Sequence, residues 1–136
     1  MYLLDTNILS ELIKRHPNPR LLSRLGSKPA YTLFTSSICI MELRYGSALR
    51  ADFEIFWHNI TQEIISRVNL VAIGEKEALA AGDILAELRK SGQIIGLEDV
   101  LIAASAITHQ FVVVTANVRH FARVKGLKVE NWLDKD

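Results

Sequence analysis

The stretch FVVVTAN at residues 111–117 is the most strand-like part of the 136-residue chain. Its first four residues are apolar and three of them are β-branched, a pattern typical of a strand that is covered on both faces of a parallel sheet. Parallel strands need crossover connections, which are usually helices. The stretch therefore predicts an α/β fold, provided that helices separate the other strands.

Four other segments fit strands, and helical patterns lie between them. The expected strands cover Tyr2–Leu4, Tyr31–Thr35, Asn69–Ile73 and a short segment near Val129. The spacing of apolar residues predicts helices that begin near Thr6 or Asn7, Asn18, Ser36 or Ser37, Phe53, Glu75 and Glu98 or Asp99, and a helical turn over Arg119–Arg123. This alternation predicts a three-layer α/β sandwich, with a mainly parallel central sheet flanked by helices.

Length and composition fit one globular domain over residues 1–136, with 49% apolar and 23% charged residues. The net charge is +1, which excludes a uniformly basic protein that binds nucleic acid indiscriminately. The charge is uneven along the chain. Residues 1–50 carry seven Lys and Arg against three acids, residues 51–110 carry four against nine, and residues 111–136 carry five against three.

The single cysteine, Cys39, lies between Ile38 and Ile40, so we expect a buried thiol without a catalytic role. One cysteine forms no internal disulfide, which fits a reducing compartment. The N-terminus lacks the basic start of a signal peptide, and no apolar run approaches the roughly 18 residues of a membrane span. The sequence therefore predicts a cytoplasmic protein with no membrane partner.

Three acids attract attention because the ends of parallel strands form the usual ligand-binding edge of such sheets. Asp5 directly follows the first strand, Glu42 lies in a mostly apolar helix, and Asp99 opens the helix before the last long strand. Each acid has a structural interpretation as well: Asp5 as a helix N-cap, Glu42 as an ion-pair partner, and Asp99 as a first-turn acid favoured by the helix dipole.

At one edge of a sheet the three carboxylates would repel one another and would need a counter-ion. Carboxylates without cysteine or histidine favour a hard divalent cation, Mg²⁺ or Mn²⁺. Such an ion lowers the pKa of a water and neutralises charge on a phosphate, which suits phosphodiester hydrolysis. The pattern thus indicates a metal-dependent hydrolase.

Several motifs in order resemble the PIN-domain ribonucleases, and in particular the VapC toxins of type II toxin–antitoxin pairs. They are Leu4–Asn7, Ser37 with Glu42–Gly46, Ile95–Ala104, Val114–Phe121, and Gly126–Leu127 with Glu130–Trp132. The match covers about residues 2–132, nearly the whole chain. No one motif is specific, but together they identify the family.

The resemblance implies a PIN-like fold and a Mg²⁺- or Mn²⁺-dependent endoribonuclease that cleaves structured RNA, such as tRNA or rRNA, and so inhibits translation. It also implies a cognate VapB-type antitoxin that neutralises the toxin, operator DNA that is bound only through the antitoxin, and a homodimer.

By position, the resemblance makes Asp5 and Asp99 the principal metal ligands and Glu42 the third acid of the catalytic site. Thr6 or Thr115 would hydrogen-bond a water or a carboxylate there. Asn7 and Asn117 are the polar residues expected to line the site.

The chain departs from the family pattern in the closing motif, where many relatives carry a fourth acid. Asn117, Arg119 and His120 stand there instead, so a second metal ion would be held weakly. His120 is either a contact for phosphate or a proton carrier, or simply a surface residue. The missing acid also leaves an alternative, a catalytically inactive PIN-like module that binds RNA or protein.

Basic residues follow both the opening and the closing motif, and they are expected to flank the acidic centre and bind RNA phosphates. The candidates are Arg15, Arg119, His120 and Arg123, with Lys14, Arg20, Arg24, Lys125 and Lys128 nearby in sequence.

Overall fold

The computed structural model describes residues 1–134, and within them five parallel strands form one sheet in the order β3-β2-β1-β4-β5. The strands are β1 (Tyr2–Leu4), β2 (Leu33–Ser36), β3 (Asn69–Val71), β4 (Val112–Val114) and β5 (Val129–Glu130). All the pairings are parallel, so the expected α/β architecture is confirmed and the sheet is entirely, not just mainly, parallel in this region.

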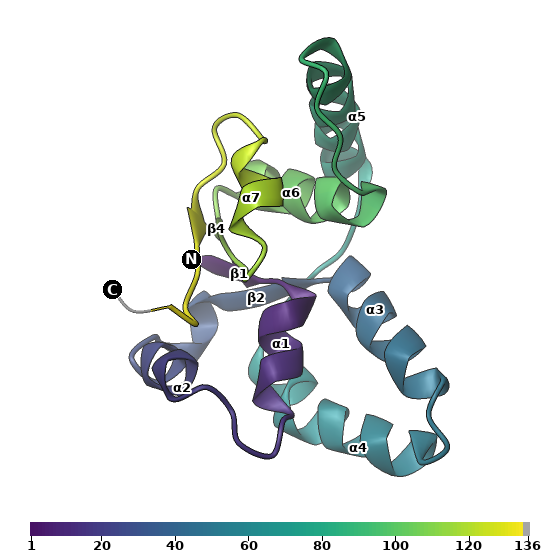
Figure 1. Cartoon of the computed structure of the whole chain (residues 1–136), viewed down its shortest axis with the longest axis vertical. Coiled ribbons are helices and arrows are strands. Elements are labelled where there is room, and N and C mark those ends of the chain that lie inside the picture. The colour runs from purple at the N-terminus through teal and green to yellow at the C-terminus, as the bar shows by residue number, and fades with distance from the viewer. Residues whose placement is uncertain (135–136) are drawn as a thin grey trace.

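Helices cover both faces of this sheet, with α5, α6 and α7 on one side and α1, α2 and α4 on the other (Figure 1). They are α1 (Thr6–Leu12), α2 (Pro19–Gly26), α3 (Ser37–Ala48), α4 (Phe53–Glu63), α5 (Glu75–Lys90), α6 (Leu97–His109) and α7 (Val118–Ala122). Short 3-10 helices span Ala30–Thr32 and Ile65–Arg67. Among the helices of residues 1–134, none combines the length and the apolar character that a membrane crossing requires.

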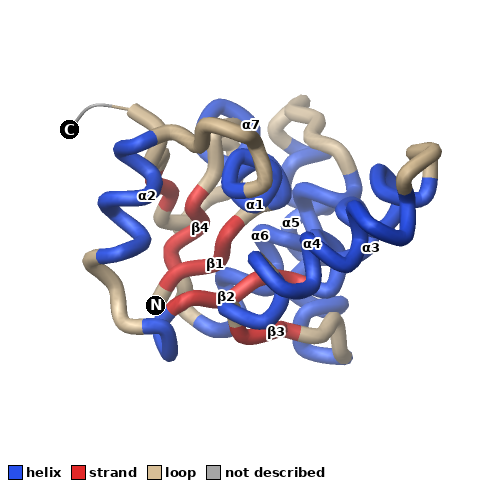
Figure 2. Tube along the Cα trace, turned by 90° about the horizontal axis from the view of Figure 1, so that it is seen from below, coloured by secondary structure: helices blue, strands red, loops and turns tan. Residues whose placement is uncertain are grey.

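The order of the strands places a switch point beside β1, which lies at the centre of the sheet (Figure 2). From β1 the chain builds outward to β2 and β3 on one side, then crosses to β4 and β5 on the other. The helices that follow β1 and β4 therefore diverge, and a crevice opens at the carboxyl ends of these two strands. Ligands of open α/β sheets bind in such a crevice.

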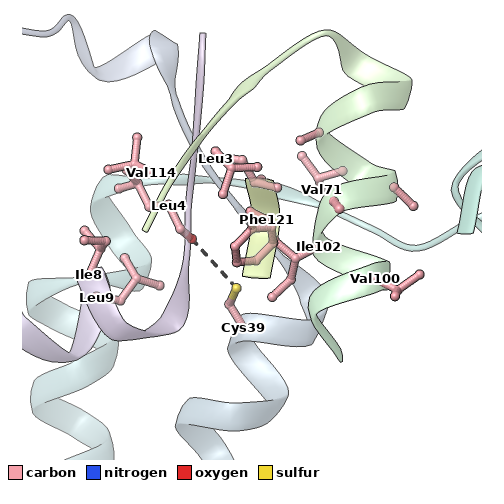
Figure 3. Close-up of a cluster of buried hydrophobic side chains, with 14 of the residues drawn as sticks. Leu3, Leu4, Ile8, Leu9, Cys39, Val71, Val100, Ile102, Val114 and Phe121 are labelled. Carbon is pink, nitrogen blue, oxygen red and sulfur yellow. Dashed lines mark hydrogen bonds between the residues drawn. The ribbon is translucent and has the colours of Figure 1, made fainter. Parts of the chain in front are cut away.

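The core is continuous from the sheet to the helices next to this crevice (Figure 3). Leu3 and Leu4 of β1 and Val113 and Val114 of β4 are completely buried. Phe121 is also completely buried and fixes the short helix α7 against the core. Burial of an aromatic side chain contributes roughly 2–3 kcal/mol, which a five-residue helix needs because it is too short to be stable alone.

Several expected boundaries differ by one or two residues, and the third strand ends at Val71 and not at Ile73. The second strand begins at Leu33 and not at Tyr31, because Thr32 turns back and its N–H and Oγ1 both donate to Pro29 O (2.9 and 2.6 Å). The first helix begins at Thr6, one of its two expected starts, and Asp5 caps it, because its carboxylate accepts from Thr6 N at 2.8 Å. The helical turn at the end of the chain is confirmed as α7, shifted to start at Val118.

Candidate active site

A cleft of about 470 Å³ lies at the switch point, where the structure brings the three predicted acids together. Its lining includes all three acids, together with Thr6, Asn7, Ser10, Glu11, Lys14 and Asn117. Asp5 comes from the end of β1, Glu42 from the second turn of α3, and Asp99 from the first turn of α6. Asp5 and Asp99, 94 positions apart in sequence, thus line one cleft, because the carboxyl ends of parallel strands lie at one edge of the sheet.

Asp5 lies at the bottom of the cleft and is only 4% exposed. Its Oδ1 accepts from Thr6 N at 2.8 Å, and its Oδ2 accepts from Thr115 Oγ1 at 2.8 Å. Asn7 Nδ2 approaches Oδ2 at 3.3 Å. The carboxylate is therefore held in one orientation by Thr6, which follows β1, and by Thr115, which follows β4. The interpretation of Asp5 as a helix cap is correct, and it is compatible with a second role in the cleft.

The pKa of Asp5 is raised from 3.8 to about 6, mainly by burial and in smaller part by the negative charges of Asp99 and Glu42. The hydrogen bonds from Thr115 and Thr6 act in the opposite direction but do not cancel the effect. A carboxylate in this environment binds a proton, or a cation, more readily than an exposed one does.

Glu42 points to the same cleft and is half-buried. Its Oε1 accepts a 2.8 Å hydrogen bond from Thr6 Oγ1. Arg50, one conceivable ion-pair partner, instead pairs with Asp52 at 2.8 Å. Thr6 therefore links two of the acids, because its N–H donates to Asp5 and its hydroxyl donates to Glu42.

Asp99 is joined to the closing motif by His120. The distance from His120 Nδ1 to Asp99 Oδ2 is 3.1 Å, and Asn117 Nδ2 lies 3.1 Å from the same ring nitrogen. Helix α7 lies beside α6, which brings these side chains within reach (Figure 1). His120 thus stands next to a candidate metal ligand and is not a remote surface residue.

The remaining predicted polar residues hold the two strand ends together. Asn7 Oδ1 accepts from Ala116 N at 3.1 Å, so the start of α1 is tied to the loop after β4. Thr115 is completely buried, and its Oγ1 accepts from Asn117 N at 2.9 Å while donating to Asp5. The bonds from Ala116 N to Asn7 and from Thr115 Oγ1 to Asp5 cross from one strand end to the other and fix the width of the crevice, whereas the bond from Asn117 N lies within the loop after β4.

Cys39 is a neighbour of the site that sequence reasoning missed. Its Sγ lies within 4.8 Å of ligand atoms of Asp5 and Glu42, although it was correctly predicted to be buried. Cys39 and Glu42 are three residues apart on α3 and therefore share a face, which was the available signal. Burial raises the pKa of the thiol to about 11, and Sγ donates to Leu4 O at 3.7 Å (Figure 3). The sulfur is thus a neutral packing group.

The basic residues near the cleft differ in how they are held. Lys14 pairs with Glu11 at 2.7 Å on the cleft wall, and this contact lowers the pKa of Glu11. Arg123 donates from Nη1 to Ile94 O at 2.6 Å and so secures the loop before α6. Arg15 and Arg119 are exposed.

The donor set fits a divalent cation. Carboxylate oxygens of Asp5 and Glu42 lie within 4.8 Å of each other, and Asp99 lines the same cleft. Asp5, the most buried of the three acids, has a raised pKa because its charge is unfavourable there. A bound cation would remove this penalty and the mutual repulsion of the acids.

Comparison with known proteins connects this geometry to a family. The sequence model of the PIN domain matches residues 2–127. Ribonuclease VapC2 of Haemophilus influenzae is 38% identical over 132 residues, which is 97% of this chain and 98% of the relative. The tRNA(fMet)-specific endonuclease VapC of Salmonella typhimurium is 32% identical over 133 residues, with 96% and 97% covered.

A solved structure agrees in both fold and sequence. This chain is similar to a chain in the crystal structure of VapBC2 from Rickettsia felis bound to a DNA fragment from its promoter. The match has a TM-score of 0.87 and 33% identity, and it covers 96% of this chain and 98% of the other. The family model and these relatives cover nearly the whole chain, and the fold agrees with theirs, so the chain belongs to the VapC ribonucleases of the PIN domain family.

Proposed function

We propose that the chain is a Mg²⁺- or Mn²⁺-dependent endoribonuclease, a VapC-type toxin that cleaves structured RNA. The observation that carries this proposal is the convergence of Asp5, Glu42 and Asp99 on one cleft at the switch point of the sheet. The catalytic residues and the metal ligands are these same three acids. A divalent cation bound there would supply a water of lowered pKa as nucleophile and neutralise charge on the scissile phosphate.

The chain's own residues orient this site before any ligand arrives. Thr6 holds Glu42 through its hydroxyl and Asp5 through its N–H, while Thr115 fixes the other oxygen of Asp5. Asn7 holds the loop after β4 against α1, because its Oδ1 accepts from Ala116 N, and Asn117 N donates to Thr115 Oγ1 within that loop. Preorganised carboxylates need no rearrangement during the reaction, which is the main way in which such sites lower a barrier.

The substrate class follows from the relatives and from charge. One relative is named a tRNA(fMet)-specific endonuclease, which supports tRNA as a candidate beside rRNA. Three acids cannot hold a polyanion unless a metal and positive side chains offset their charge. Arg15 after the end of α1, Arg119 in α7 and Arg123 just after α7 supply that charge, and together with His120 they form our proposed basic rim.

The rim gives a salt-dependence prediction. Arg15→Ala and Arg119→Ala should each weaken binding of all RNAs and should lower the slope of log Kd against log salt by about 1, because each removes one phosphate contact. Fluorescence anisotropy with a labelled tRNA over a salt series measures this. Arg89→Ala, at the end of the projecting helix α5, is the matched control (Figure 1). Slopes for all three variants equal to that of the parent would contradict the rim.

The proposed partner is a VapB-type antitoxin that silences the toxin and that alone contacts operator DNA. The Rickettsia felis neighbour is a VapBC2 complex bound to promoter DNA, which supports an antitoxin partner and a complex that binds DNA. We also propose a homodimer. Met41 and Tyr45 of α3 and Leu49 at its C-cap are more than half exposed at four-residue spacing, which favours a contact surface there.

We also propose that residues 1–136 form one PIN domain and that the protein is cytoplasmic. Residues 135 and 136 lie outside the described part of the chain. The single cysteine suits a reducing compartment.

Cleavage of total RNA by antitoxin-free protein tests the function. With Mg²⁺ or Mn²⁺ we expect discrete fragments of one RNA species, and with EDTA we expect none. Fragment ends mapped by sequencing would identify the substrate. Binding of RNA without any cleavage, with either ion, would favour the inactive RNA-binding module, the alternative that the missing fourth acid raises.

A further inference from the structure

One face of α1 forms a wall of the cleft that holds the three acids. The lining includes residues of this helix and of the turn after it at spacings of three and four, which places them on one side: Asn7, Ser10, Glu11 and Lys14. The turn continues beyond α1, because Lys14 N donates to Glu11 O at 3.3 Å. The wall therefore begins next to Asp5 and ends at a lysine.

Lys14 is the only cationic side chain among the described residues that line the cleft. The arginines of the proposed basic rim do not belong to this lining. A strand of RNA that crosses the cleft carries further phosphates on either side of the scissile one, and these are bound by positive charge. On the cleft wall, Lys14 offers that charge.

Glu11 holds the ammonium group of Lys14 in place. Lys14 Nζ lies 2.7 Å from Glu11 Oε2, while Glu11 Oε1 accepts from Asn18 N at 3.0 Å. The side chain of Glu11 is only 15% exposed and is fixed between these two partners, whereas that of Lys14 is 64% exposed. An ammonium group has three N–H donors, so those not used by Glu11 remain for the oxygens of a phosphate.

The ammonium group lies away from the acids along the axis of α1. Because Nζ rests against Glu11, it is about one helical turn, roughly 6 Å, further along the axis than Asn7, which lies beside Asp5. This separation is too large for Lys14 to share the phosphate that the acids hold. It corresponds to the spacing of consecutive phosphates in an extended strand.

We infer that Lys14 binds the phosphate next to the scissile one, on the side of the strand that lies along α1, and so sets the register of cleavage. The inference rests on the proposed function, because the acids must hold the scissile phosphate for Lys14 to hold its neighbour. Lys14 is a positioning residue. Its contact is the same before and during the reaction, so it lowers KM and leaves kcat unchanged.

A scan with uncharged phosphates tests the inference on the antitoxin-free chain. The probe is a short RNA oligonucleotide that carries the cleavage site mapped for this protein, with one methylphosphonate placed at each non-scissile position in turn. For the parent we expect one position beside the cut at which loss of charge raises KM by about 10-fold, the usual effect of losing a hydrogen bond to a charged group.

Two substitutions at Lys14 identify its partner. Lys14→Gln should raise KM for the unmodified RNA by about the same 10-fold without changing kcat, and the methylphosphonate at the sensitive position should then cost nothing more, because the two groups form one contact. Lys14→Arg keeps the charge and should keep the sensitivity of the parent. Lys76→Gln is the matched control, since Lys76 is an exposed lysine on α5, away from α1 (Figure 1).

The outcomes separate this inference from the proposed function. A Lys14→Gln protein that is folded by urea unfolding, cleaves RNA and remains as sensitive as the parent at every position would overturn the role of Lys14 alone, and Lys14 would then be only the counter-ion of Glu11. A fall in kcat at unchanged KM would do the same. A parent that cleaves no RNA with Mg²⁺ or Mn²⁺ would overturn the proposed function, and the inference with it.

Discussion

Replacing Asp5 by asparagine is expected to lower the rate of RNA cleavage by about three orders of magnitude and to leave the fold intact. The amide retains an oxygen for the N–H of Thr6 but removes the charge that would bind a cation. A metal ion contributes several kcal/mol to a transition state, and each 1.36 kcal/mol is a factor of ten in rate. Single-turnover cleavage of the RNA identified above, with saturating Mn²⁺, measures the loss.

Asp83→Asn is the matched control for this substitution. Asp83 is an exposed acid on α5, so its replacement makes the same change of net charge away from the cleft. It should cleave at the rate of the parent. An Asp5→Asn protein that retains more than a tenth of the parent's rate would show that the carboxylate is not a catalytic metal ligand.

The same substitution is expected to stabilise the metal-free protein at neutral pH. The pKa of Asp5 is raised from 3.8 in the unfolded chain to about 6 in the folded one, so the folded state holds this proton more tightly. Stability from this group is therefore fully present below about pH 4 and is lost as the pH rises through 6. Two pKa units correspond to about 3 kcal/mol, an upper limit for the gain from Asp5→Asn at pH 7.

Urea unfolding in EDTA at pH 4 and pH 7 checks this expectation. The free energies of unfolding of parent and variant should agree at pH 4 and differ at pH 7, where the variant is more stable. Mn²⁺ at 100 times its Kd should then raise the stability of the parent alone, by about 2.7 kcal/mol. A parent that is more stable than Asp5→Asn at pH 7 in EDTA would contradict the raised pKa of Asp5.

Much of this arrangement could be predicted because the decisive signals are local. The uninterrupted run before Thr115 and the short one before Asp5 each indicate a buried strand, and parallel strands end at one edge. The clustering of Asp5, Glu42 and Asp99 in one cleft follows from that rule together with the position of each acid in its helix. Their roles as metal ligands stay predictions.

Other features depend on distances that only the folded chain defines. The helix bearing Cys39 could be predicted, but its tilt brings the sulfur next to Asp5, and no local pattern specifies that tilt. Arg123 was predicted to face RNA, yet its guanidinium donates to Ile94 O from a different element. Whether Arg123 also contacts RNA stays a prediction. The link between His120 and Asp99 likewise arises because α7 packs beside α6.

Phe121→Ala is expected to lower the free energy of unfolding by about 3–5 kcal/mol, the usual cost of a large cavity in a core. Phe121 is completely buried and is the main anchor of α7, which carries His120. A loosened α7 also releases the contact of His120 with Asp99, a proposed metal ligand, so we expect Mn²⁺ affinity to fall in the folded fraction. Urea unfolding measures the stability, and a titration that follows the electron paramagnetic resonance signal of free Mn²⁺ measures the affinity.

Val118→Ala is the control, because Val118 lies on the same short helix but is 38% exposed. It should change stability by no more than about 0.5 kcal/mol and leave Mn²⁺ affinity unchanged. If Phe121→Ala lost stability but bound Mn²⁺ like the parent, α7 would not position the ion. If both substitutions cost the same, α7 would be held by its loops and not by the aromatic anchor. The buried ring therefore ties the stability of the sheet to the geometry of the cleft, and the two variants separate these contributions.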